Sequence, residues 1–259
     1  MIIDKLAYNS KLSKTAPTEK VIFAITSMIL CIISNSILVC IITILAMLFI
    51  IIHIGKTNIK TVFHLMTVPL FFLIFGCIAI IISINTDKSE MILYIKLDKI
   101  FLGITKYSIF SGVTTFTKSL GAVSCMYFLS LTTPVNDIFS LLRKSIIPNF
   151  IVEIAELIYR YIFVLLDVCK KIHLSQDSRL GYVNLKTGYR STVLLVSNLF
   201  IRSMNQAEKT FTALSARGYD GTINLLSEKH KHNKPFILFG LVYIFGVTAL
   251  TVFLKAGIK

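Results

Sequence analysis

The sequence predicts an all-α integral membrane protein with about five transmembrane helices and long amphipathic helices on the cytoplasmic side. Three observations lead to this fold class. The chain is 55% apolar and 15% charged, with a mean hydropathy of +0.77, which departs strongly from the composition of soluble domains. Apolar runs long enough to cross a bilayer recur along it. Most of the 27 lysines and arginines would fall on one side of those runs.

Four apolar runs are expected to form five membrane spans. Residues 21–54 are too many for one span, and Ser34-Asn35-Ser36 is the natural place for a tight reversal into two short spans. A single tilted helix is the alternative. The remaining spans are expected at residues 62–84, 107–131 and 236–254. The polar first twenty residues are not followed by a cleavage site, so no cleavable signal peptide is expected.

The basic residues orient the chain in a bacterial-type plasma membrane. Cytoplasmic loops carry the excess of lysine and arginine, which places the N-terminus and residues 135–234 in the cytoplasm and the C-terminus outside. The expected domains are a membrane domain over 1–134, a cytoplasmic domain over 135–234 and a last transmembrane helix over 235–259. The net charge of +14 then indicates topology and contact with the lipid bilayer, and no nucleic acid is expected as a partner.

Motifs for catalysis or cofactor binding are not found. The five cysteines have neither zinc-ligand nor disulfide-framework spacing, and neither a metal site nor a cofactor is expected. Gly55-Lys56-Thr57 is similar to the end of a P-loop, but Ile50 stands where the first glycine is required. Without HExxH, GxSxG or a nucleophile–base pair, the chain is not expected to be an enzyme.

Apolar spacing predicts three helices in the cytoplasmic segment. Thr133-Pro134 should end the fourth span. Glu156 with Arg160, and Asp167 with Lys171, are expected as stabilising pairs one helical turn apart. The expected helices cover residues 135–144, 149–173 and about 191–217. Neither long helix is apolar enough to span a bilayer, and both should lie at the membrane surface.

Two similar segments each combine an arginine, a glycine and small neighbours at the expected end of a long helix: Gln176-Asp177-Ser178-Arg179-Leu180-Gly181-Tyr182 and Leu214-Ser215-Ala216-Arg217-Gly218-Tyr219-Asp220-Gly221. Gly181 and Gly218 are expected to be the left-handed residues that close the helices. An arginine there complements the negative helix end, which is a sufficient structural explanation for either copy. The repetition favours a function: an arginine with small neighbours can pair closely with an acidic residue of a partner that is present twice.

An ordered set of segments carries a resemblance to a known family. The chain resembles the transmembrane T component (EcfT/CbiQ type) of energy-coupling factor transporters, specifically the cobalt-type T subunit. The segments that carry it are Asp4-Lys5-Leu6-Ala7-Tyr8-Asn9-Ser10-Lys11-Leu12, Leu131-Thr132-Thr133-Pro134, Tyr159-Arg160-Tyr161-Ile162-Phe163, Ser178-Arg179-Leu180-Gly181-Tyr182, Leu199-Phe200-Ile201-Arg202-Ser203 and Ala216-Arg217-Gly218-Tyr219-Asp220-Gly221. The chain departs from the family at Ser178, where alanine is common, and at Lys118, where arginine is expected.

The resemblance implies a scaffold that joins two cytoplasmic ABC-type ATPase subunits to a separate substrate-binding membrane subunit. Each arginine segment would lie at the tip of a coupling helix and engage one ATPase. The chain itself would bind neither ATP nor metal, and the cargo would be cobalt, with nickel or a vitamin as alternatives. The expected coupling residues are Ser178, Arg179, Leu180, Ala216, Arg217 and Gly218.

Two questions stay open at this level. The chain could be a stand-alone permease or channel with a basic, lipid-binding cytoplasmic domain. Lys118, an ionisable residue within an expected span, is expected to face the interior of this protein or the interface with the substrate subunit. Its stem could instead reach the lipid headgroups. Residues 91–102 could form a strand pair, an interfacial helix or a lid.

Overall fold

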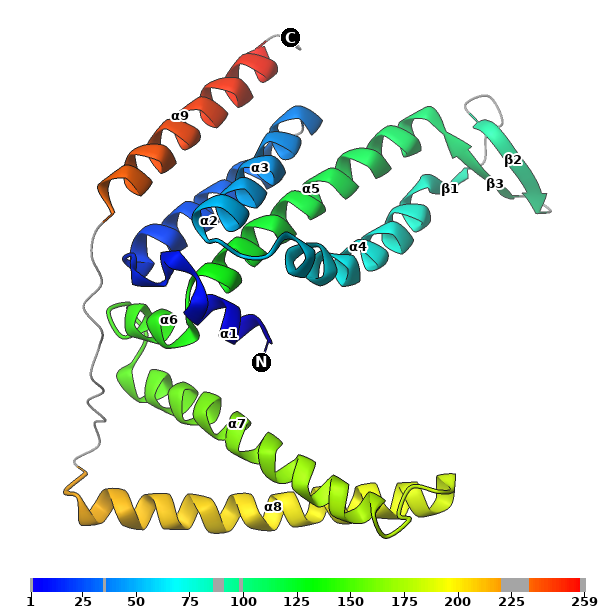
Figure 1. Cartoon of the computed structure of the whole chain (residues 1–259). Coiled ribbons are helices and arrows are strands. Elements are labelled where there is room, and N and C mark those ends of the chain that lie inside the picture. Colours follow the sequence, from blue (N-terminus) through cyan, green and yellow to red (C-terminus); the bar gives the residue numbers. More distant parts are fainter. Residues whose placement is uncertain (1, 35, 86–90, 98–99, 220–232, 257–259) are drawn as a thin grey trace. The chain divides into compact units, whose positions relative to one another are not determined.

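The computed structural model describes residues 2–34, 36–85, 91–97, 100–219 and 233–256 (Figure 1). The chain forms two compact units, one of residues 1–138 and 228–259 and one of residues 139–227. The elements of the first unit are α1 (Ile2–Asn9), η1 (Lys11–Lys14), α2 (Pro17–Ile33), α3 (Ile37–Phe49), η2 (Ile50–Ile54), α4 (Ile59–Ile81), β1 (Ile82–Asn85), β2 (Met91–Leu97), β3 (Ile100–Thr105), α5 (Lys106–Thr132) and α9 (Lys234–Ala256). The second unit contains α7 (Asn149–Asp177) and α8 (Leu185–Ala216), and α6 (Val135–Leu142) lies at the boundary.

The long apolar run near the N-terminus is divided into two helices, as predicted. α2 ends at Ile33 and α3 begins at Ile37. The Cys40 thiol donates a hydrogen bond to the Cys31 carbonyl over 3.7 Å, so the two helices pair in opposite directions. The predicted reversal is confirmed, and the single tilted helix is excluded.

Three helices are long and apolar enough to cross a bilayer, at Ile37–Ile54, Ile59–Ile81 and Pro235–Leu254. The other two expected spans correspond to α2, which has 17 residues, and α5, which has 27. α5 packs against α1, α2, α3 and α4, and its buried residues are mostly small or hydroxylic, including Gly112, Thr117, Gly121 and Ser124. Small residues allow close helix packing in membranes. α5 therefore meets protein on several sides, which explains its lower apolarity.

An aromatic cluster forms the core at one end of this unit. The ring of Phe23 on α2 makes edge-to-face contacts with Phe128 on α5 at 5.6 Å and with Phe236 and Tyr243 on α9 at 5.8 and 5.5 Å. Such contacts add to the free energy gained by burying the rings. These contacts hold α9 against α2, the first long helix of the chain.

A small antiparallel sheet follows α4 in the chain and leads into α5 (Figure 1). Its strand order is β1-β3-β2, and β3 pairs with β1 from Ile82 opposite Ile104 to Asn85 opposite Phe101. The strand alternative for residues 91–102 is therefore the observed one, although residues 98–99 lie outside the described part. The sheet is a minor addition to a helical fold.

The second unit is an antiparallel helical hairpin. The Tyr161 hydroxyl of α7 lies 2.5 Å from the Thr210 hydroxyl of α8, and the Gln176 amide donates to the Ser191 carbonyl over 2.9 Å. At 1.5 Å rise per residue, α7 and α8 are about 43 and 48 Å long. Both extend beyond the expected ranges, to Asp177 at the end of α7 and from Leu185 at the start of α8.

One of the two expected helix-surface ion pairs forms. Lys171 lies 2.8 Å from Asp167, and its ammonium holds the pKa of this exposed carboxyl below its usual range. The other predicted pair, Glu156 with Arg160, is wrong. The Glu156 carboxylate oxygen instead lies 2.6 Å from a guanidinium nitrogen of Arg143, a residue that follows α6. Arg143 reaches Glu156 from outside the helix, a contact that spacing along the helix could not indicate.

Candidate functional site

The end of α7 is closed by a pair of backbone hydrogen bonds that place Arg179 at its tip. The N–H of Leu180 donates to the Asp177 carbonyl over 2.9 Å, and the N–H of Gly181 donates to the Gln176 carbonyl over 2.9 Å. These are the two bonds of a Schellman motif, which satisfies the last carbonyls of a helix. Arg179 is the residue immediately before the left-handed position of this motif.

The end of α8 is closed by the same two bonds. The N–H of Gly218 donates to the Ser215 carbonyl over 3.0 Å, and that of Tyr219 donates to the Leu214 carbonyl over 3.1 Å. Arg217 again directly precedes the left-handed residue. When the two motifs are aligned by these bonds, Ser178 corresponds to Ala216 and Arg179 corresponds to Arg217. The two arginines therefore occupy equivalent positions at the ends of their helices.

The glycines of the two segments do not have the expected common role. Gly218 has a φ of +73° and closes its helix as predicted. The prediction for Gly181 is wrong: the left-handed residue of α7 is Leu180, with a φ of +59°. Gly181 lies one position later, where a Cβ would stand 2.8 Å from the Gln176 carbonyl oxygen and 2.7 Å from the Ser191 hydroxyl. It is required by the close approach of the Gln176 carbonyl of α7 and of Ser191 on α8, and not by a left-handed backbone.

All six expected coupling residues are exposed on the second unit. Leu180 is the most conspicuous, because 72% of its surface is accessible although its side chain is apolar. Within the described part of the chain, the guanidinium groups of Arg179 and Arg217 are held by neither a hydrogen bond nor an ion pair. Both are therefore available to an acidic group from outside.

A network of hydrogen bonds fixes the loop that carries Arg179. The Tyr182 hydroxyl donates to the Gln176 side-chain oxygen over 2.8 Å, and the Tyr182 ring stacks on His173 at 4.5 Å. The Ser191 hydroxyl donates to the Gly181 carbonyl over 2.9 Å. These contacts join the end of α7 to the start of α8, so the Arg179 tip is preorganised.

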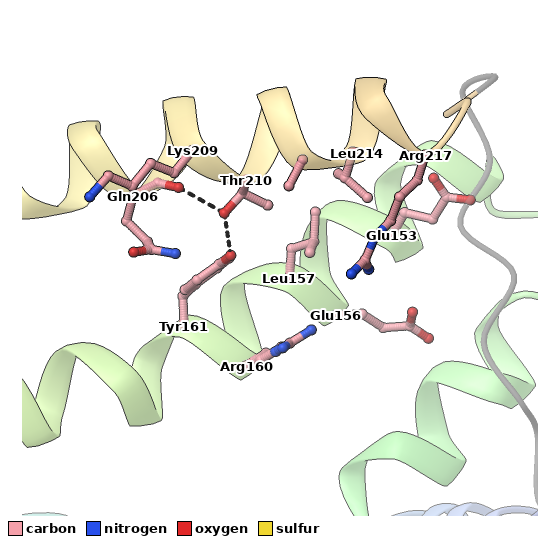
Figure 2. A pocket seen from close by; sticks show the side chains of 11 residues that line it. Glu153, Glu156, Leu157, Arg160, Tyr161, Gln206, Lys209, Thr210, Leu214 and Arg217 are labelled. Carbon is pink, nitrogen blue, oxygen red and sulfur yellow. Dashed lines mark hydrogen bonds between the residues drawn. The ribbon is translucent and has the colours of Figure 1, made fainter.

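The Arg217 tip borders a pocket of about 310 Å³ between α7 and α8. Figure 2 shows the Arg217 side chain directed from the end of α8 toward α7. The polar and charged residues that line the pocket are Glu153, Glu156, Arg160, Tyr161, Gln206, Lys209, Thr210 and Arg217. Several of these were not expected as site residues, because one sequence does not show which faces of α7 and α8 meet.

The charges around this pocket favour the binding of an acidic group. Arg160, Lys209 and Arg217 contribute three cations, while Glu153 and Glu156 contribute two carboxylates. The Glu156 carboxylate already binds Arg143. A carboxylate that entered beside Arg217 would therefore meet more positive than negative charge, and a guanidinium binds it best through two parallel hydrogen bonds.

The two tips lie beyond opposite ends of α8. Arg179 precedes the first residue of α8, and Arg217 follows the last of its 32 residues. The helix rise places them on the order of 50 Å apart. This separation suits two contact points on a large partner or on two copies of one partner.

Lys118 lies on α5 in the first unit, half-buried and beside the α2–α3 hairpin. The Cys31 thiol of α2 donates a hydrogen bond to the Lys118 carbonyl over 3.9 Å. Lys118 thus lies against other helices of its own unit and far in sequence from the arginine tips. Among the described residues, His, Cys, Asp and Glu side chains do not gather in threes as a metal ion would need.

Comparison with known proteins identifies the family of this chain. The family model of CbiQ, a cobalt transport protein, matches residues 8–229. The CbiQ cobalt transport protein of Salmonella typhimurium is 30% identical over 86% of this chain and 99% of its own length.

Two further relatives extend the likeness. The putative fused cobalt transport protein CbiMQ of Methanocorpusculum labreanum is 30% identical over 95% of this chain and 41% of the longer fused protein. The energy-coupling factor transporter transmembrane protein EcfT of Staphylococcus aureus is 24% identical over 86% of this chain and 84% of that protein. The likeness covers both the first unit and the hairpin.

Proposed function

This chain belongs to the CbiQ family of cobalt transport proteins, and from that premise we propose that it is the membrane scaffold of an energy-coupling factor importer. In this role it would transmit the ATP-driven motion of two cytoplasmic ATPases to a separate substrate-binding membrane subunit. The chain would bind neither ATP nor the transported ion. Its cargo would be cobalt, in agreement with the names of its relatives.

One observation supports this proposal most strongly: the same helix-ending motif occurs twice on one hairpin and presents an arginine each time. Arg179 and Arg217 both precede the left-handed residue of a Schellman motif. A helix end alone needs no arginine, and the two guanidinium groups have no partner within the described residues. Two equivalent cationic tips suit two equivalent acidic grooves, one on each ATPase.

The nature of the second partner is supported by the fused relative. CbiMQ joins a CbiQ-like part to a further part in one protein, so a second cobalt-transport component is a natural neighbour of this chain. The long exposed apolar helices of the first unit, such as α4 with Phe72 79% exposed, offer surface to lipid and to such a subunit. The localisation that follows is the plasma membrane, with the hairpin in the cytoplasm.

Co-purification tests this proposal. The chain is produced with the ATPase and membrane proteins encoded beside it, and is isolated through an affinity tag on its C-terminus. We expect two ATPase copies and one substrate-binding subunit per chain. A stand-alone permease or channel would be isolated without ATPases and would still transport its ion, and that result would contradict the proposal.

A further inference from the structure

Lys20 is a lysine whose side chain is completely buried, with 0% of its surface accessible. It lies near the start of α2, and its ammonium group donates hydrogen bonds to two carbonyl oxygens. One is that of Leu12, at 3.0 Å, and the other is that of Thr132, at 2.9 Å. Leu12 and Thr132 are 120 residues apart in the sequence, so this one side chain ties together distant parts of the first unit.

The Thr132 carbonyl is a favourable acceptor for a buried cation. Thr132 is the last residue of α5, and the final carbonyls of a helix have no intrahelical donor. They also carry the negative end of the helix dipole. The carboxylates of Asp137 and Glu19 attract the same ammonium group through space. These interactions offset part of the cost of removing a charge from water, although burial remains the larger effect.

The Leu12 carbonyl joins the N-terminal segment to this site. It also accepts hydrogen bonds from the backbone N–H and the hydroxyl of Thr15, at 3.1 and 2.6 Å. Lys20 thereby connects η1, α2 and the end of α5. The Asn136 amide adds a contact to the Tyr8 hydroxyl at 3.0 Å, so the first turn of α6 is bound to α1 as well.

We propose that Lys20 is a positioning residue that keeps the junction between α5 and α6 rigid, so that motion of the hairpin reaches the membrane helices. The chain leaves the first unit for the second within α6, only a few residues after Thr132. A loose junction would let the second unit move without moving α5. This inference rests on the proposed coupling function and adds to it the place where force enters the membrane domain.

The test replaces Lys20 by methionine, which keeps the length of the stem but removes the charged donor. Lys14→Met, at an exposed position of η1, is the matched control. Both variants are assembled with the ATPases and the substrate-binding subunit in vesicles, and ion uptake and ATP hydrolysis are measured together. We expect Lys20→Met to retain the ATPases and hydrolyse ATP, while uptake per ATP falls by at least about fivefold, the lower end of typical coupling effects. Lys14→Met should match the wild type.

An unchanged uptake per ATP in Lys20→Met, with any loss confined to the amount of complex, would overturn the proposal and leave Lys20 a purely structural residue. Failure of the wild-type complex to bind ATPases would instead contradict the proposed function. If Lys20→Met does not assemble, hydrogen exchange on the wild-type complex decides the question. The amides of residues 128–137 should exchange equally slowly with and without ATP, whereas faster exchange in one state would identify a hinge and overturn the inference.

Discussion

Gly181 and Gly218 each follow an arginine closely, but each is glycine for a different physical reason. Gly218 adopts a left-handed backbone, and a Cβ there would meet open space. Gly181 has no such backbone constraint, but its missing Cβ leaves room for the Gln176 carbonyl and the Ser191 hydroxyl. Substitutions at the two positions should therefore fail in different ways.

Gly181→Ala should loosen the Arg179 tip. The added methyl group would stand 2.7 Å from the Ser191 hydroxyl and 2.8 Å from a backbone carbonyl, and crowding of this kind costs about 1–3 kcal/mol. Limited proteolysis should cut the loop over residues 178–184 faster than in the wild type. Gly188→Ala is the control, because its methyl group would meet only the Tyr182 ring at 3.6 Å. Equal cutting of both variants and the wild type would contradict this account of Gly181.

Leu180→Gly should separate stability from docking. A left-handed backbone costs a non-glycine residue about 1–2 kcal/mol. Glycine at this position should therefore keep or raise the midpoint of thermal unfolding of the isolated chain. The exposed leucine side chain would be lost as a contact for the ATPase, and affinity measured by titration of the ATPase should fall. A variant that binds the ATPase as tightly as the wild type would show that Leu180 has no contact role.

At the scale of elements, α5 organises the first unit because its small residues admit close neighbours. A Cβ on Gly121 would lie 2.5 Å from the Cys31 sulfur of α2. Gly121→Val should therefore separate α2 from α5 and lower stability by about 1–3 kcal/mol. Gly246→Val on α9 is a matched control, since its surroundings are open within 4 Å. Thermal unfolding in detergent should show a lower midpoint only for Gly121→Val, and equal midpoints would contradict the central role of α5.

Most of the helices could be predicted from the sequence because apolar periodicity and length report directly on helix type. The reversal near Ser34 and the presence of α4 followed from these signals, although α4 ends at Ile81 and residues 82–84 of the expected span lie in β1. The sheet could only be left as one of several alternatives, because the short apolar run over residues 91–102 suits a strand or a helix equally well. Gly181 was wrongly predicted to be the left-handed residue of its helix end. A glycine in the sequence can indicate either a left-handed backbone or close packing, and the sequence alone does not distinguish the two.

The candidate site was only partly visible in the sequence. The repeated arginine segments showed where a partner could dock, since their local order is almost the same. The pocket beside Arg217 depends on which residues of α7 and α8 face each other, and Lys20 depends on a contact over 112 residues to Thr132. A lone lysine at the start of an apolar run gives no local signal of burial, so tertiary structure was needed to find it.

At the scale of the whole molecule, the proposed orientation in the membrane can be tested. In the proposed orientation, single cysteines at Asn58 and Lys186, both exposed, lie in the cytoplasm, and one at Tyr107, which is 81% exposed, lies outside. In intact cells a membrane-impermeant thiol reagent should label only the Tyr107→Cys chain above the background of the unsubstituted protein. Labelling of the cytoplasmic positions from outside would reverse the orientation and place the hairpin where no ATPase could reach it.

The central claim is that Arg179 and Arg217 dock the ATPases. Loss of one partner from a desolvated charge pair costs roughly 2–5 kcal/mol, and each 1.4 kcal/mol is a factor of about ten in affinity. Binding of purified ATPase to the reconstituted chain tests this claim most directly, with Arg179→Ala, Arg217→Ala, their double variant and Arg190→Ala, an exposed arginine on α8, as the control. We predict that each single variant binds more than about tenfold more weakly, that the double variant binds more weakly still, and that Arg190→Ala binds like the wild type. Normal binding by the double variant would show that the two arginines only end their helices.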